Sequence, residues 1–392
     1  MQSQVAPGQS RTRLKALVVG GGIGGLAVAR ALMLRGHDVH VFERASTFGE
    51  VGAGLQVGPS AVKVLYSLGL KEPLHAVACA PDRFVTFNWQ DGRILHNEPY
   101  QESFAAYGAP YLTAHRADLH RILLDSAKDA RLTTGKQALR MQSMPHGAAV
   151  EFEDGSTAEG DIVIGADGIH SAIRNSLWGA DHPRYTHYLG WRGVLPMDDA
   201  LALLGKDAAE LHRKNVVLWR SPTGTMLFYP LRSGKLLNFF AGRYTDDWAE
   251  ESWTIPSSQS ELLAAFDGWP KERLEICRLM PEVFKWAFFD RDPLPRWTKG
   301  RATLLGDAAH PMMPTLAQGA AITIEDAFAL ARNLDHSSDD PAGALLNYER
   351  ERIERATRVQ TLSRLQFEDN RQVPPPPPRD RTWIFRHDVT VA

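Results

Sequence analysis

The stretch from Lys15 to Gly25, KALVVGGGIGG, decides the fold of this chain. It starts with a short apolar run, 16–19, and its glycines lead into a helical pattern that continues to Arg35. An apolar run, a glycine-rich turn and a helical pattern in this order predict a strand, a tight turn and a helix. Gly36 supplies a stop signal, so the helix is expected to end there.

The glycines fit the motif G-x-G-x-x-G at Gly20, Gly22 and Gly25. In this motif the first glycine makes the tight turn, the second lets the backbone approach a pyrophosphate, and the third allows close packing of helix on strand. The segment 39–42 alternates like a second strand, and Glu43 follows at roughly the 20-residue spacing at which an acid binds a ribose. The sequence therefore predicts a dinucleotide site; the alternative is a glycine-rich turn in some other α/β fold.

Length and charge limit the classes of partner. The 392 residues exceed the roughly 100–200 that are typical of one domain, so two lobes, or one lobe with a large insertion, are expected. Lys plus Arg number 44 and Asp plus Glu 46, a formal net charge of −2. This balance gives no indication of a nucleic-acid or membrane partner, and a small-molecule partner is expected.

Cysteine usage and hydropathy indicate a cytoplasmic protein. The two cysteines, Cys79 and Cys277, have neither metal-ligand nor C-x-x-C spacing, which argues against a disulfide framework and a metal site. No apolar stretch is long enough to span a bilayer, and residues 1–13 lack the apolar core of a signal peptide. We interpret those residues as a loose tail.

Two later segments repeat the pattern of a strand that ends in an acid. The run 161–168 ends in Asp167-Gly168, and the run 302–311 contains Gly306-Asp307. Strand ends that point an acid into a crevice are where open α/β sheets bind ligands. A helix expected from Gly319 would offer its amides, with their partial positive charge, to whatever lies at the second strand end.

Other segments are expected to surround this site. The segment 48–59 is too glycine-rich for a regular element and could lie close to a ring system or be an ordinary connector. A helix is expected over 60–68 and a hairpin over 83–94. Arg116 falls at the start of another helix, where a cation opposes the helix dipole, so it either pairs with an anion or is solvated.

From 178 to about 292 the glycine motifs give way to aromatic, alternating strands, with helical patterns expected at 260–266 and 281–286. A long charged helix over 348–365 and a polyproline linker follow. We expect a cofactor domain made of residues 14–82, 111–180 and 293–335. A substrate domain is expected from residues 83–110 and 181–292. Residues 336–392 are expected to form a C-terminal helix with a tail.

Together, the segments 20–25, 161–174 and 306–311 resemble the group A flavoprotein monooxygenases, which include p-hydroxybenzoate, salicylate and 3-hydroxybenzoate hydroxylases. The likeness covers nearly the whole chain. Finer likenesses, at 50–59, 115–119, 191–193 and 317–320, point to the salicylate, 3-hydroxybenzoate and 6-hydroxynicotinate branch. The resemblance implies an α/β fold with a Rossmann-like FAD-binding domain, an inserted, mostly β-sheet substrate domain and C-terminal helices.

The resemblance also implies roles for residues. Glu43 would bind the adenosine ribose, Arg116 the ribityl-phosphate region and Asp307 the ribityl chain. Asp167 and Arg174 would serve both FAD and the nicotinamide nucleotide, while amides at the start of the last motif would face the flavin pyrimidine edge. The residues implied for cofactor binding are Gly20, Gly22, Gly24, Gly25, Glu43, Arg44, Gly54, Arg116, Asp167, Arg174, Gly306, Asp307, Pro311, Gly319 and Ala320.

The resemblance implies that NADH or NADPH reduces FAD, that O₂ adds, and that a flavin C4a-hydroperoxide hydroxylates a small aromatic. Without a second glycine motif, the nicotinamide nucleotide is expected to bind transiently in a cleft. Gly52, Gly54 and Gly58 could let the isoalloxazine ring swing, and a bulky residue at position 54 is expected to slow reduction more than FAD binding. A homodimer is expected by analogy.

Substrate contacts are expected from Tyr229, Gln56 and Thr315, with Arg192 and His187 as partners of a carboxylate or phenolate. The alternative for Tyr229 is a core tyrosine with a satisfied hydroxyl. His310 is interpreted as a structural histidine under the flavin. The substrate stays open, because Phe228 and Pro314-Thr315 depart from the relatives' pattern. The sequence also leaves open any decarboxylation and the choice of NADH or NADPH.

Three other readings compete. A flavin-dependent halogenase would carry W-x-W-x-I-P, but Glu251 stands where the first tryptophan of that signature belongs, before Trp253-Thr254-Ile255-Pro256. A flavin oxidase or reductase of the same fold would not insert oxygen, because fold does not fix reaction. A catalytically silent FAD-binding regulator would not consume NAD(P)H in response to substrate.

Overall fold

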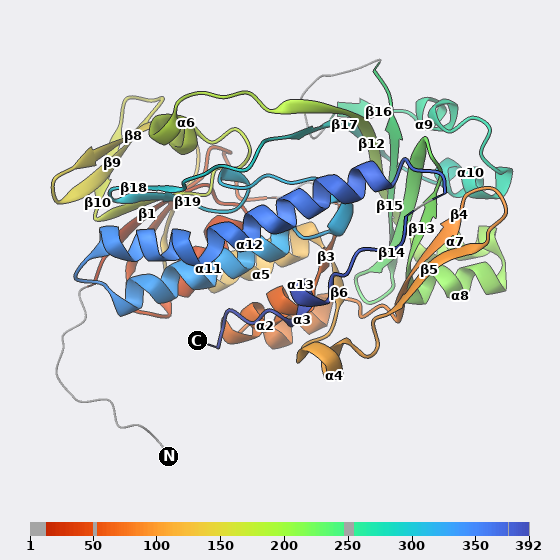
Figure 1. Cartoon of the computed structure of the whole chain (residues 1–392), viewed down its shortest axis with the longest axis horizontal. Coiled ribbons are helices and arrows are strands. Elements are labelled where there is room, and N and C mark those ends of the chain that lie inside the picture. Colours follow the sequence, from red (N-terminus) through yellow and green to blue (C-terminus); the bar gives the residue numbers. More distant parts are fainter. Residues whose placement is uncertain (1–12, 50–52, 247–254, 375, 392) are drawn as a thin grey trace.

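A six-stranded sheet forms the centre of the first lobe (Figure 1). The computed structural model describes residues 13–49, 53–246, 255–374 and 376–391. The sheet order is β18-β19-β11-β1-β2-β7, parallel except for β18. Its inner strands are continuous apolar runs because both faces are covered. The bounds are β1 Lys15–Val19, β2 Asp38–Phe42, β7 Arg131–Thr133, β11 Ile162–Gly165, β18 Thr298–Lys299 and β19 Ala302–Leu304.

Helices cover one face of this sheet and a three-stranded meander lies on the other (Figure 1). Helix α12 continues toward the second lobe, where Tyr244 donates a hydrogen bond to the carbonyl of Phe367 (2.9 Å). The helices are α1 Ile23–Met33, α2 Pro59–Ser67, α3 Lys71–Val77, α5 Arg116–Ser126, α11 Gly319–His336 and α12 Pro341–Asp369. The meander consists of β8 Ala138–Met144, β9 Gly147–Phe152 and β10 Thr157–Gly160, with α6 Ala172–Trp178 beside it.

An eight-stranded sheet forms the second lobe, in the order β16-β17-β12-β15-β14-β13-β4-β5. Neighbours are antiparallel except β13 and β4, which are parallel. The early hairpin thus joins strands more than 100 residues later in the chain. Its first strand lies within the predicted range 83–94, but its second strand begins only at Ile94 and continues to Pro99. The bounds are β4 Arg83–Asn88, β5 Ile94–Pro99, β12 Arg184–Pro196, β13 Asn215–Arg220, β14 Gly224–Leu231, β15 Leu236–Tyr244, β16 Ile255–Ser257 and β17 Val283–Asp290.

The two faces of this second sheet have different environments. Leu195, Phe228, Phe239 and Phe266 belong to a buried core between the outer face and four helices, which are α7 Met197–Leu204, α8 Lys206–Lys214, α9 Gln259–Ala265 and α10 Lys271–Arg278. The inner face meets a two-stranded ribbon, β3 Gly54–Val57 and β6 Leu112–His115, and the segment 306–316 with its short helices η1 Gly306–Ala308 and η2 Pro314–Leu316. The inner face is therefore turned toward the first lobe.

The predicted fold class is confirmed: the chain is an α/β protein with a Rossmann-like sheet and a separate, mostly β-sheet lobe. Three local expectations are wrong. Part of the glycine-rich segment forms β3, because pairing with β6 supplies its hydrogen bonds. The segment 281–286 is largely strand β17, because β12 and β16 pair with it on both sides. Helix α12 is longer than predicted at both ends, beginning after an Asp340 cap.

The C-terminal segment folds back onto the first lobe (Figure 1). Its helix α13 Thr382–Arg386 packs against α2 and against α4 Ser103–Tyr107. Ile384 and Phe385 are buried there. None of the helices in the described ranges is long and apolar enough to cross a membrane. Residues 1–12 of the predicted tail, Gly52 and the halogenase-like positions 251–254 lie outside those ranges.

Candidate functional site

Four of the predicted motifs follow the carboxyl ends of adjacent parallel strands. The glycine turn follows β1, Glu43 follows β2, Asp167 follows β11 and Asp307 follows β19. Because these strands are neighbours and parallel, their carboxyl ends meet at one edge, which we call the strand-end edge. Strand β1 has β2 on one side and β11 on the other, so the order of the strands reverses at β1. Open sheets bind ligands at the strand ends beside such a point.

The glycines of the first motif have separable structural reasons. A Cβ atom on Gly20, whose φ is +107°, would lie 2.2 Å from the carbonyl oxygen of Ala166, and one on Gly25 would lie 1.9 Å from the carbonyl oxygen of Gly20. A Cβ on Gly24 would lie 2.5 Å from Thr323 of α11. A Cβ on Gly22 would meet nothing within 4 Å. Three glycines are therefore required by packing, whereas Gly22 faces open space at the start of α1.

Two acids of the strand-end edge lie where the motif predicts. The Glu43 carboxylate accepts hydrogen bonds from the backbone amides of Gly21 (2.7 Å) and Ala45 (2.8 Å), so it sits directly on the glycine turn. Asp307 is exposed between buried neighbours, because the positive φ of Gly306 (+64°) turns the chain there. Arg44 is also exposed at this edge.

The pattern predicted that Asp167 points into the crevice. In the structure it does not. Its carboxylate accepts hydrogen bonds from the Ser171 hydroxyl and from the Ile173 amide (3.2 Å), at the start of α6. Unpaired amides at a helix start attract a nearby carboxylate, which explains the turn inward. Burial raises the pKa of Asp167, and these hydrogen bonds oppose that rise.

Arg174 is buried and connects two loops of the same edge. It donates to Asp181 (2.9 Å) and to the carbonyl of Ala308 (3.4 Å). Arg291 donates to the carbonyl of Ile169 (2.9 Å) and forms an ion pair with the same Asp181. Two buried arginines thus share one half-exposed carboxylate at a cavity of about 370 Å³, lined by Arg174, Asp181, His182, Arg184, Asp290, Arg291, Asp292, Pro293 and Leu294.

The start of α11 completes the strand-end edge. Ala317 has a positive φ of +54°, and this turn leads to the amides of Gly319 and Ala320, both of which are partly exposed. Just upstream, the carbonyl of Pro311 accepts a hydrogen bond from Gln360 of α12 (2.8 Å). A helix start stabilises negative charge.

The residues present fit FAD. Gly22 leaves room for a pyrophosphate at a helix start, Glu43 lies on the turn where a ribose would bind, and Asp307 offers an exposed carboxylate further along the same edge. Arg116 begins α5, and its amide donates to the carbonyl of Ala53 (2.9 Å), which ties that helix to β3.

Tyr229 lies on the inner face of the eight-stranded sheet and contacts the ribbon. It pairs with Asn238 of β15, so both side chains point to the same face. A Cβ on Gly54 would lie 2.5 Å from the Tyr229 ring, and the Gly54 amide donates to the Asn238 side chain (2.7 Å). A bulky residue at position 54 would therefore displace Tyr229 besides hindering any ring movement. Burial raises the pKa of the Tyr229 hydroxyl far above its ordinary value, so this phenol is protonated at neutral pH.

Gln56 is buried on the same ribbon, two residues from Gly54. Its Oε1 atom accepts a hydrogen bond from the Tyr111 hydroxyl (3.0 Å). Tyr111 stacks on Tyr100 at 3.9 Å, and Phe385 meets it edge-on at 5.7 Å. This bond uses one of the two lone pairs of the amide oxygen, and the amide nitrogen is the group of Gln56 that can donate to a ligand.

Arg192 lies on β12 and also belongs to the inner face. It pairs with Phe240 of β15 and with Phe284 of β17, and its guanidinium lies 5.3 Å from the centre of the Trp286 ring. Trp286 belongs to an aromatic cluster that spans β12, β15, β17, the loop after His310 and the end of α12, formed by Tyr188, Phe240, Tyr244, Trp286, Phe288, Met313 and Phe367. Arg192 thus sits beside aromatic rings that exclude water.

The other two substrate candidates lie elsewhere. The Thr315 hydroxyl donates to the carbonyl of Ser363 (2.5 Å), so it anchors the loop to α12. The His187 side chain is 63% exposed and pairs with Asp246 (2.6 Å), at an irregularity in β12. The structure brings Tyr229, Gln56 and Gly54 together and leaves His187 at the surface, because the irregularity turns it away from the sheet.

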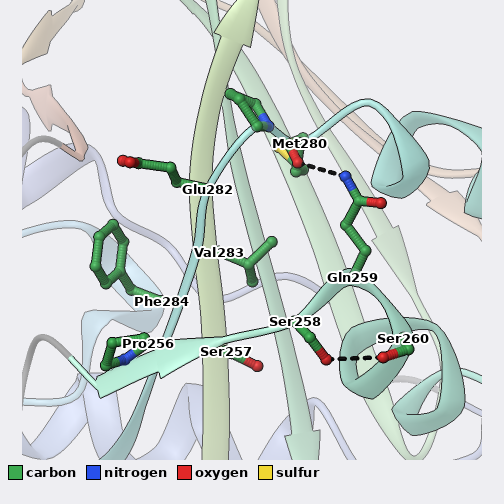
Figure 2. Close-up of a pocket in the computed structure, with 10 residues that line it drawn as sticks. Pro256, Ser257, Ser258, Gln259, Ser260, Met280, Glu282, Val283 and Phe284 are labelled. Atoms are coloured by element: carbon green, nitrogen blue, oxygen red, sulfur yellow. Dashed lines mark hydrogen bonds between the residues drawn. The ribbon is translucent and has the colours of Figure 1, made fainter.

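A larger groove, of about 660 Å³, lies at the β16 edge of the second sheet (Figure 2). Three of its polar side chains bond locally: Gln259 donates to the carbonyl of Met280 (2.7 Å), and the hydroxyls of Ser258 and Ser260 are 2.8 Å apart. None of its lining residues comes from the strand-end edge. We assign no function to it.

The sequence reading missed Asn238, Arg291 and the aromatic cluster. Asn238 interrupts an apolar strand, Leu236-Leu237-Asn238-Phe239-Phe240, and a polar residue in such a run is a signal that was available. Arg291 follows directly on a strand that was predicted as helix. The cluster has no local signal, because its members come from five separate segments.

Comparison with known proteins agrees with this geometry. A family described as "FAD binding domain" matches residues 13–363. The chain is 38% identical, over 91% of its length and 88% of the relative's, to 3-amino-4-hydroxybenzoate 2-monooxygenase PtmB3 of Streptomyces platensis. It is 36% identical, over 95% and 94%, to 6-hydroxynicotinate 3-monooxygenase of Pseudomonas fluorescens. A salicylate hydroxylase in complex with substrate superposes with a TM-score of 0.80 at 28% identity, covering 97% of each chain. The chain belongs to the family of FAD-dependent monooxygenases that hydroxylate small aromatic compounds.

Proposed function

We propose that the protein hydroxylates a small phenolic aromatic acid, with NADH or NADPH as reductant and O₂ as the source of oxygen. One observation carries the proposal. The strand-end edge faces a sheet surface on which a protonated tyrosine and a buried arginine, Tyr229 and Arg192, come from strands two places apart. Such strands are separated by about 10 Å. The side chains of Tyr229 and Arg192 extend into this distance, which leaves between their polar ends room for one substituted ring.

The bound FAD would accept a hydride and activate oxygen, and the protein would position the reactants and exclude water. The α11 amides offer partial positive charge where the reduced ring becomes negative. Tyr229 donates a hydrogen bond to the phenolic oxygen of the substrate, which favours the phenolate. Arg192 pairs with a carboxylate, and the aromatic cluster keeps solvent from the reacting atoms. Gln56 offers its amide nitrogen to a substrate oxygen.

We place the phosphates of the nicotinamide nucleotide at the cavity between Arg174 and Arg291. These arginines are 3% and 5% exposed and share a single carboxylate. Asp290 and Asp292, which also line the cavity, pair with Arg184 and Arg364. The two buried arginines therefore remain the cavity's donors for the oxygens of a phosphate, a group that arginine binds with charged hydrogen bonds. Arg291 and Arg174 also donate to the carbonyls of Ile169 and Ala308, in the loops that follow β11 and β19. This connection agrees with transient binding beside the flavin site.

Relatives of this chain are named for the oxidation of an aminohydroxybenzoate, a hydroxynicotinate and a 3-hydroxybenzoate. These compounds share one aromatic ring, a hydroxyl group and a carboxylate, and this shared chemistry supports the proposed substrate class. The domain boundaries given above, a cytoplasmic location and a homodimer belong to the same proposal.

The test is a panel of ring compounds incubated with the purified, FAD-loaded protein. Hydroxybenzoates, aminohydroxybenzoates and hydroxypyridine carboxylates should stimulate NADH or NADPH oxidation and yield hydroxylated products. The same rings without a carboxylate are the matched controls and should stimulate less. Oxidation that ignores the ring compound, with hydrogen peroxide as sole product, would favour the oxidase or reductase reading instead.

A further inference from the structure

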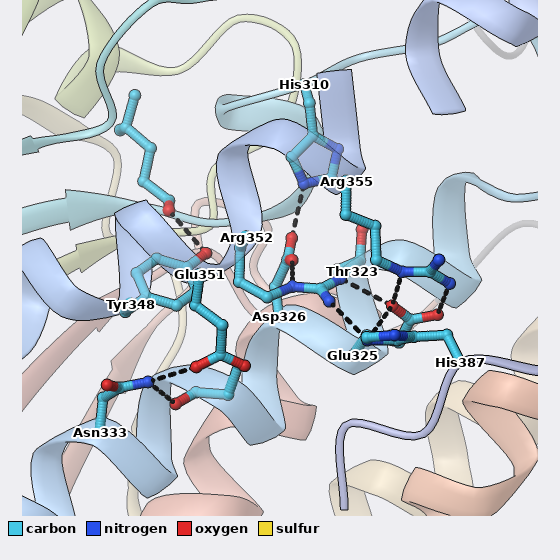
Figure 3. Close-up of polar contacts among 12 residues, drawn as sticks. His310, Thr323, Glu325, Asp326, Asn333, Tyr348, Glu351, Arg352, Arg355 and His387 are labelled. Carbon is cyan, nitrogen blue, oxygen red and sulfur yellow. Dashed lines mark hydrogen bonds and ion pairs between the residues drawn. The ribbon is translucent and has the colours of Figure 1, made fainter. Parts of the chain in front are cut away.

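A chain of buried ion pairs links α11 to α12 behind the strand-end edge (Figure 3). Glu325 and Asp326 lie in the second turn of α11, only a few residues after the amides that start this helix, and both are 0% exposed. Arg352 of α12 lies between them and is also 0% exposed. Three charges without access to water need a reason, because the burial of a charge is expensive.

The charges compensate one another with direct hydrogen bonds. Arg352 donates to Asp326 (2.8 Å) and to Glu325 (2.7 Å), and Arg355 donates twice to Glu325 (2.7 and 2.8 Å). Burial alone would raise the pKa of Glu325, but Arg352 and Arg355 lower it to about 2. The pKa of Asp326 is also lowered, by His310 and Arg352. Both carboxylates are therefore ionised at neutral pH, and Oδ2 of Asp326 is left for a second partner.

That second partner is His310. Its Nε2 atom lies 2.5 Å from Oδ2 of Asp326, and the ring is 1% exposed. Within the described ranges, its other nitrogen, Nδ1, has no hydrogen-bond partner. The position of this imidazole therefore depends on Asp326.

His310 belongs to the same turn as Asp307. The amide of His310 donates to the carbonyl of Gly306 (2.8 Å), which closes the turn that exposes Asp307. A displacement of the His310 ring would therefore also displace Asp307, because one hydrogen-bonded turn contains both residues. Gln360 holds the carbonyl of Pro311 but does not reach this turn.

We propose that Asp326, oriented by Arg352, is a positioning residue that holds the turn 306–310 against α11 and so fixes where Asp307 meets FAD. The inference rests on the proposed contact of Asp307 with the cofactor. In this account the two acids of α11 serve geometry rather than chemistry. His310 and Arg352 hold the pKa of Asp326 below its usual value, and Arg352 orients the carboxylate that holds His310 in place.

The test uses Asp326→Asn and His310→Leu in the full-length protein. Each removes the charged hydrogen bond between α11 and the turn, which is expected to speed FAD dissociation by about tenfold or more. Each substitution should also shift the visible absorption and circular dichroism of the bound flavin. His310→Gln keeps a donor near the position of Nε2 and should restore both properties most of the way to wild type.

Arg332→Met is the matched control. Arg332 also joins α11, α12 and the C-terminal segment, through Glu351 (2.5 Å) and the carbonyl of Val389 (2.7 Å), but it does not contact the turn 306–310. This variant should lose thermal stability and leave FAD dissociation and the flavin spectrum unchanged. If it loosens FAD as much as Asp326→Asn does, the effect is one of general stability and the proposal is wrong.

Unchanged FAD dissociation and spectrum in folded Asp326→Asn would also overturn the proposal. If that variant does not fold, His310→Leu decides, because it leaves Asp326 paired with Arg352. Asp307→Ala separates this inference from the assignment on which it rests. Weak FAD binding in Asp307→Ala together with normal binding in both other variants refutes only the positioning role, whereas normal binding in Asp307→Ala refutes the cofactor contact itself.

Discussion

The strand-end edge and the inner face of the eight-stranded sheet differ in what makes them. The edge is formed mainly by backbone: Gly22, where a Cβ atom would meet nothing within 4 Å, the amides that start α1 and α11, and the turn at Gly306. The inner face is formed by side chains such as Tyr229 and Arg192, which only strand pairing brings together. A cofactor shared by a whole family can be held by backbone geometry, whereas a substrate that differs between members has to be recognised by side chains.

The largest effect is expected at Gly22. Gly22→Val fills the space at the start of α1, and the backbone there (φ −76°, ψ −173°) accepts any residue. The apoprotein should therefore keep its stability while FAD affinity falls by about 100-fold or more, equal to about 2.8 kcal/mol. Flavin fluorescence titration and thermal unfolding of the apoprotein measure the two quantities.

Gly25→Ala is the contrasting variant. Its added methyl group would overlap the carbonyl oxygen of Gly20, so the free energy of unfolding of the apoprotein itself should drop by about 3 kcal/mol or more. A Gly22→Val protein that binds FAD normally would contradict the assignment of the pyrophosphate position.

Arg192→Gln should act on the substrate and not on the cofactor. A hydrogen bond between charged groups contributes about 1.5–3 kcal/mol, so the KM for a carboxylated ring should rise by about 10- to 100-fold. FAD affinity should stay the same, and Arg192→Lys should retain part of the substrate affinity. An equal loss for rings with and without a carboxylate would show that Arg192 acts through packing alone.

Tyr229→Phe should change the fate of oxygen more than the rate of FAD reduction. The variant keeps the ring that packs on Gly54 and loses only the hydroxyl group. We expect stability within about 1 kcal/mol of wild type, normal FAD binding, and a larger share of hydrogen peroxide relative to hydroxylated product. An unchanged ratio of hydrogen peroxide to hydroxylated product would show that Tyr229 is a core tyrosine without a role in oxygen transfer.

The smallest effect concerns pH and His387, in the C-terminal segment. Burial, together with the charges of Arg355 and Arg352, lowers the pKa of His387 from 6.5 to about 4 against the opposing effect of Glu325. As the pH falls from 6.5 toward 4, the unfolded chain takes up a proton that the folded protein refuses, so stability is lost. His387→Gln should make this decline shallower in urea unfolding between about pH 7 and pH 5. An identical pH dependence would contradict the lowered pKa.

The sequence could predict the strand-end edge because each motif there is local. A strand, a turn and a following acid are neighbours in the chain, and parallel strands place their ends together. The face of the second sheet could not be predicted, because its register depends on pairs such as Tyr229 with Asn238 and Arg192 with Phe240. The helix prediction for 281–286 is wrong for the same reason: the strand state of this segment comes from its partners on both sides. The ion pairs at Asp326 were missed because Arg352 lies on another helix.

The most direct test of the account is the destination of labelled dioxygen in the purified, FAD-loaded protein, given NADH or NADPH and a hydroxylated aromatic acid. The account predicts that one labelled oxygen atom appears on the ring of the product, and that this label is lost with FAD in Gly22→Val. Label that appears only in water or hydrogen peroxide, from a protein that binds FAD and consumes the reductant, would contradict it.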